Sequence, residues 1–294
     1  MTGRLFRLMA MLMLSLSCVS CGGPEDHLRD GKVRVFVTVP PQAYFVERIG
    51  GEHVDVSVLV APGQEPHFFE PRPRQITALS QSELYFCVGM PFEDILISRL
   101  KDQRHLKIVD TRRGIDLMEL NHDHNGHDDG NLDPHIWMSP RLAGIMARTI
   151  RDELKQADPH HADMYDANYA ALASDLEELD AHLREALRGL EGRTFYVFHP
   201  AFGYFAREYN LKQKAVEDSG KSPGARQLQQ LIDQAKADGV QVVFVQPQFS
   251  KISADALARE LNGAVVPLDP LAKDYISNMR LITQRISEAL TPAR

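Results

Sequence analysis

Residues 160–190 read HHADMYDANYAALASDLEELDAHLREALRGL. Apolar side chains recur along this stretch every three or four residues, the spacing of one face of an α-helix; they are Met164, Tyr165, Tyr169, Leu172, Leu176, Leu179, Leu183 and Leu187. A helix of 31 residues rises about 1.5 Å per residue, so it is roughly 45 Å long and exceeds the width of a small domain. The spacing therefore predicts a long rigid helix that links two halves of the chain.

Strand-like and helix-like segments alternate on both sides of this helix. Val33–Val39 precedes it and Thr194–Phe198 follows it, and both are rich in β-branched and aromatic residues, as strands are. Segments with helical spacing separate such runs, which predicts an α/β fold with two lobes, each with a largely parallel sheet flanked by helices. The predicted parts are an N-terminal lobe over residues 32–157, the linking helix over 160–190 and a C-terminal lobe over 191–294.

Composition limits the class of protein. Of the 294 residues, 44% are hydrophobic and 25% charged, as in a soluble globular protein. The net charge of −7 offers no basic surface for nucleic acid. Three cysteines are too few for a disulfide framework. We expect a monomeric globular protein that does not bind nucleic acid.

The first 21 residues resemble an export signal. Arg4 and Arg7 precede the apolar run Leu8–Leu16, and small or polar residues follow. This run is much shorter than the ~20 residues of a membrane-spanning helix. Cys21, followed by two glycines, resembles the lipidated cysteine of bacterial lipoproteins, although Cys18 stands where a leucine is usual. We therefore expect export to the periplasm or cell surface, with a lipid anchor on Cys21; secretion without lipid is the alternative.

Four candidate metal ligands lie in comparable places, and each is next to a proline. His199 and Asp269 directly follow predicted strands, and His67 lies shortly after another, where open α/β sheets bind ligands. His135 is the fourth. Imidazole and carboxylate groups suit zinc and related transition metals. The pattern predicts a divalent metal site between the two lobes.

The motifs around these residues carry a family resemblance. They are PGQEPHFFEP (62–71), LDPHIWMSP (132–140), FHPAFGYFAREY (198–209) and VVPLDPL (265–271). Over residues 32–290 the chain resembles the cluster A-I, or zinc/manganese-type, solute-binding proteins of ABC importers. The resemblance implies two lobes with a metal between them, ligands at His67, His135, His199 and Asp269, delivery to a membrane permease, and no enzymatic reaction.

The choice of metal follows from the same resemblance. Manganese-type members usually have glutamate at the position of His199, so the histidine implies Zn²⁺ as the cargo. Mn²⁺ or Fe²⁺ is the alternative. Water competes with Asp269 as the fourth ligand, while Glu65, separated from His67 by Pro66, is expected to lie too far away.

A polar loop, NHDHNGHDDGN at residues 121–131, lacks any apolar residue. Zinc-type members often carry a His-rich loop here, so His122, His124 and His127 are predicted to form an accessory metal loop. Their spacing also resembles the H-x-H-x-D-H motif of metallo-β-lactamase-like hydrolases, but Gly126 replaces the aspartate. Separately, a zinc-dependent hydrolase is the alternative from a different functional class, with the three histidines of the main site and water on the metal if Asp269 points away.

Overall fold

The structure is a computed structural model that describes residues 31–119, 132–217, 225–249, 255, 258–260 and 263–291. The predicted signal, Cys21 and the histidines of the predicted accessory loop lie outside these residues. Among the helices that the structure describes, none is both long and apolar enough to cross a membrane.

The N-terminal lobe contains a parallel sheet of four strands in the order β2-β1-β3-β4. The chain reverses its winding direction beside β1, because β2 and β3 pair with opposite edges of that strand. Prolines at the start of the three helices suit their first turns, where no backbone N–H is needed. The elements are β1 (Val33–Val37), α1 (Pro40–Gly50), β2 (Val54–Val58), α2 (Pro73–Leu79), β3 (Leu84–Cys87), α3 (Pro91–Leu100) and β4 (Lys107–Asp110).

The C-terminal lobe repeats this arrangement with a parallel sheet in the order β6-β5-β7-β8. The α/β fold with two parallel sheets is thus confirmed. Strand β6 was not predicted, because its sequence KQKA lacks the apolar residues of a buried strand and lies at the edge of the sheet. The described elements are β5 (Thr194–Val197), α6 (Gly203–Glu208), β6 (Lys212–Ala215), α7 (Ala225–Ala237), β7 (Val242–Val245), β8 (Ala264–Pro267) and α9 (Tyr275–Leu290).

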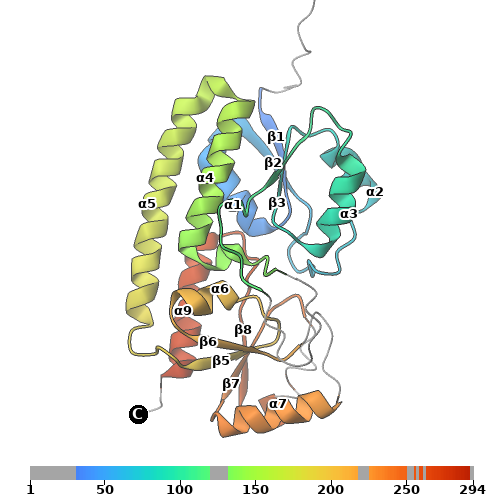
Figure 1. The fold of residues 1–294 in the computed structure, drawn as a ribbon. Helices are drawn as coiled ribbons and strands as arrows, with labels where there is room; N and C mark the ends of the chain where they lie inside the picture. Colours follow the sequence, from blue (N-terminus) through green and yellow to red (C-terminus); the bar gives the residue numbers. More distant parts are fainter. Residues whose placement is uncertain are drawn as a thin grey trace, which may run out of the picture.

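Two long helices run beside the sheets, α4 (Pro140–Ala157) and α5 (Ala162–Ala186). Figure 1 shows α5 extending along one side of both lobes, which confirms a long linking helix. It is shorter than the predicted range 160–190. Pro159–His161 instead form a separate 3₁₀ turn, and past Ala186 the chain turns toward Gly189, whose φ of 83° is incompatible with a continuing helix.

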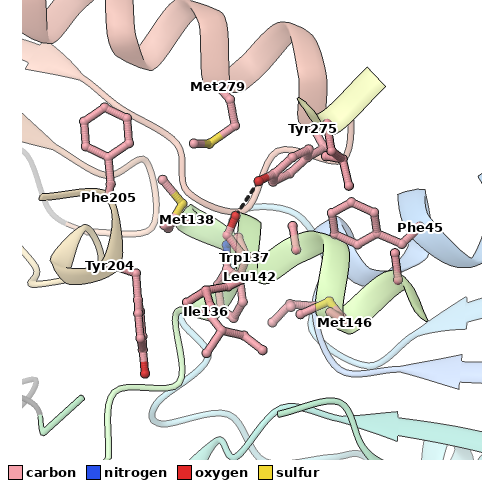
Figure 2. Close-up of a cluster of buried hydrophobic side chains, with 14 of the residues drawn as sticks. Phe45, Ile136, Trp137, Met138, Leu142, Met146, Tyr204, Phe205, Tyr275 and Met279 are labelled. Carbon is pink, nitrogen blue, oxygen red and sulfur yellow. Dashed lines mark hydrogen bonds between the residues drawn. The ribbon is translucent and has the colours of Figure 1, made fainter. Parts of the chain in front are cut away.

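One buried cluster joins the two lobes, with members in β1, α4, α5, β5 and α9. Trp137 lies near its centre and is fully buried. Its indole Nε1 donates a hydrogen bond of 2.8 Å to the Pro270 carbonyl. Its own carbonyl accepts one of 2.6 Å from the Tyr275 hydroxyl, which Figure 2 shows. The segment that carries His135 is therefore tied directly to the C-terminal lobe.

Candidate metal centre

His67 lies in the loop that leaves the carboxyl end of β2. The Glu65 carboxylate shapes this turn: it accepts hydrogen bonds of 2.9 Å from the His67 backbone N–H and 2.8 Å from that of Phe68. Burial raises the pKa of Glu65, while these two donors oppose the shift. Both oxygens of Glu65 are thus occupied by the backbone of the loop that presents His67.

His135 lies just before the 3₁₀ turn Ile136–Met138 and is almost completely buried. Asp133 Oδ1 accepts hydrogen bonds from the His135 backbone N–H at 2.9 Å and from its ring Nδ1 at 2.7 Å. A carboxylate on Nδ1 selects the tautomer that leaves the Nε2 lone pair free for a metal. Asp133 therefore orients His135.

His199 lies at the carboxyl end of β5, where its backbone is held by the side chain of Gln246. The His199 N–H donates to the Gln246 amide oxygen at 3.1 Å, and the Gln246 amide nitrogen donates to the His199 carbonyl at 2.7 Å. Glu217 bonds the ring Nδ1, and Phe249 stacks on the ring at 5.1 Å between centroids. The ring is thus held at Nδ1 and on one face, with Nε2 pointing away from Glu217.

The three imidazoles converge. Nε2 of His135 lies 3.5 Å from Nε2 of His67 and 3.4 Å from Nε2 of His199. One ring nitrogen from each of the three residues lies within 4.8 Å of the other two. Zinc–nitrogen bonds of about 2.0–2.1 Å in a tetrahedral shell place neighbouring nitrogens about 3.3 Å apart. The group therefore needs little rearrangement to hold a zinc-sized ion.

The electrostatics of the cluster also suit a cation. Burial, reinforced by the neighbouring imidazoles, holds the pKa of His67 and that of His199 well below the ordinary histidine value. Both rings are therefore neutral at neutral pH, which is the form that binds metal. Among the described residues, no other group of three or more histidine, cysteine or acidic side chains has this geometry.

Asp269 lies outside this cluster of three. Its Oδ1 accepts hydrogen bonds of 2.8 Å from the Gln248 amide nitrogen and 3.0 Å from the Leu271 backbone N–H. Three of the four predicted ligands thus meet in space, and the role of Asp269 as a ligand stays a prediction.

Asp133 and Glu217 were not among the predicted site residues. Asp133 had a recognisable signal, because a carboxylate two residues before a candidate ligand can reach its ring across a tight turn. Glu217 had none, since it follows β6, the strand that was not predicted.

A family model described as "ZnuA: Zinc-uptake complex component A periplasmic" matches residues 35–289. This chain belongs to that family. The family is one of transport components that bind a substrate and is not a family of enzymes, which confirms the resemblance noted in the sequence.

Individual relatives agree with this assignment. The high-affinity zinc uptake system protein ZnuA of Bacillus subtilis (strain 168) is 31% identical over 280 residues, covering 91% of this chain and 88% of the relative. A crystal structure of ZnuA has a TM-score of 0.83 and 42% identity, covering 88% of this chain and all of that chain. A second, of a ZnuA deletion mutant with zinc bound, has a TM-score of 0.82, 42% identity and coverage of 90% and 100%.

Proposed function

We propose that this protein captures Zn²⁺ outside the cytoplasm and delivers it to the membrane permease of an ABC importer, with His67, His135 and His199 as ligands. The observation that carries the proposal is the convergence of the three Nε2 atoms, with separations of 3.4 and 3.5 Å from His135. The family match to a zinc-uptake component supports zinc as the cargo.

Capture requires no chemical step. The rings of His67 and His199 are already neutral at neutral pH, because their pKa values are lowered. A zinc ion that binds them therefore displaces few protons. Asp133 and Glu217 hold the rings of His135 and His199 in place and raise their basicity as ligands. Asp269 or a water molecule completes the four-coordinate shell. Mn²⁺ and Fe²⁺ bind imidazole more weakly than Zn²⁺ in the general order of divalent metals, so they are the weaker alternatives.

The cellular setting belongs to the same proposal. The N-terminal pattern supports export, and Cys21 supports a lipid anchor that keeps the protein near its permease. His122, His124 and His127 supply accessory contacts for zinc. We propose a monomer as the acting form; one chain contributes all three histidines of the cluster, so the site needs no second copy.

The test replaces each of the three histidines with alanine and measures zinc affinity by competition with a chelator of known affinity. Loss of one of three nitrogen ligands is expected to weaken zinc binding at least about 100-fold, since removing only a supporting hydrogen bond already costs 10–100-fold. His182→Ala is the matched control, because His182 is exposed on α5 away from the cluster, and wild-type affinity is expected. Wild-type affinity in all three single variants would refute the site.

A further inference from the structure

Gln248 follows β7 and lines the same small cavity as two of the proposed ligands. The cavity has a volume of about 10 Å³, enough for one water-sized group. Besides Gln248, its walls include Glu65, His135, His199, Phe249 and Leu271. A group in this cavity lies beside the metal cluster and faces the side chains of both lobes.

The Gln248 amide is oriented by Asp269. The atom 2.8 Å from Asp269 Oδ1 must be the amide nitrogen, because an amide oxygen there would face a carboxylate oxygen with no hydrogen between them. The amide oxygen consequently points the other way. It is buried and accepts no hydrogen bond from any residue in the described part of the chain.

Glu65 and Asp269, the two carboxylates near the cluster that do not bond a histidine ring, accept hydrogen bonds from other groups. Glu65 accepts from two backbone N–H groups of its own loop, and Asp269 accepts from Gln248 and from the Leu271 backbone. The Gln248 oxygen, by contrast, is a buried acceptor with no donor among the described residues, and it belongs to a side chain that lines the cavity. A buried acceptor without a donor destabilises the folded protein unless a ligand or water bonds to it.

We propose that Gln248 is a positioning residue that reserves the fourth place on the zinc for an exchangeable ligand. Its amide nitrogen holds Asp269 outside the shell, and its amide oxygen accepts a hydrogen bond from a protic ligand on the metal, such as water. An exchangeable ligand gives an incoming donor group of the permease a place to attack the bound zinc, which favours release without dismantling the histidines. This inference rests on the proposed function.

The first experiment is a double-mutant cycle on zinc affinity, with wild type, Gln248→Met, Asp269→Asn and the double variant. Methionine keeps the length of the side chain and removes both the donor and the acceptor. With Gln248 present, Asp269→Asn is expected to weaken zinc binding by no more than about threefold. In the Gln248→Met background, Asp269 keeps only the Leu271 N–H as a donor to Oδ1 and can turn toward the metal. Asp269→Asn is there expected to cost at least ten times more than that.

The second experiment loads the same proteins with Co²⁺ and follows azide binding through the visible spectrum, which reports the ligands on the metal. Azide is expected to bind the wild type and to bind Gln248→Met at least tenfold more weakly, because Asp269 then occupies its place. Gln284→Met, an exposed glutamine on α9 bonded to Glu288, is the matched control and is expected to behave as wild type.

The outcomes separate the two proposals. Equal effects of Asp269→Asn in both backgrounds, or azide binding that is absent from the wild type or unchanged in Gln248→Met, overturn the role of Gln248 while zinc capture stands. A folded wild type that fails to bind zinc overturns both.

Discussion

The low pKa of His67 predicts how the stability of the zinc-free protein depends on pH. Its ring is surrounded by the rings of His135 and His199, and burial and these neighbours disfavour the protonated form. In the unfolded chain, by contrast, a histidine takes up a proton near pH 6.5. The unfolded state therefore binds more protons than the folded state below pH 6.5, so stability falls as the pH falls through that value.

The magnitude follows from linkage. While His67 stays neutral in the folded state, the proton on the unfolded side favours unfolding by about 1.4 kcal/mol at pH 5.5 and by less than about 0.1 kcal/mol at pH 7.5. His67→Gln removes this contribution. The loss of stability between pH 7.5 and 5.5 is thus expected to be about 1.4 kcal/mol smaller in the variant than in the wild type.

Urea denaturation of the zinc-free protein at the two pH values measures this difference. A single transition is expected, because one buried cluster joins the two lobes. His182→Gln, at an exposed position on α5, is expected to keep the wild-type pH dependence. If His67→Gln lost as much stability as the wild type on acidification, the ring would not be held neutral and the reasoning would be wrong.

Two further predictions concern the supports of the site. Asp133→Asn removes the charged acceptor on His135 Nδ1 and is expected to lower zinc affinity 10–100-fold in chelator competition; wild-type affinity would contradict the orienting role of Asp133. Trp137→Phe leaves the Pro270 carbonyl without its indole donor. The substitution is expected to lower the free energy of unfolding, measured by urea denaturation, by about 1–3 kcal/mol. An unchanged midpoint and slope would show that this hydrogen bond contributes nothing to the packing of the lobes.

The sequence by itself determined the order and type of most elements. Apolar spacing identified the linking helix, and β-branched runs identified strands such as β1 and β5, because both patterns reflect burial against neighbours whatever the global arrangement. The same reasoning failed for β6, whose polar sequence KQKA pairs only through its backbone at a sheet edge. Histidines after strands could likewise be singled out as candidate ligands before any contact was known.

Only the tertiary structure decided which candidates meet. His135 and His67 are 68 residues apart and His135 and His199 are 64 apart, and their nitrogens converge because Trp137 and the shared core pack the lobes together. The structure also placed Glu217 on His199 and Gln248 on Asp269. Such contacts depend on the directions in which side chains leave different loops, and local sequence patterns do not encode those directions.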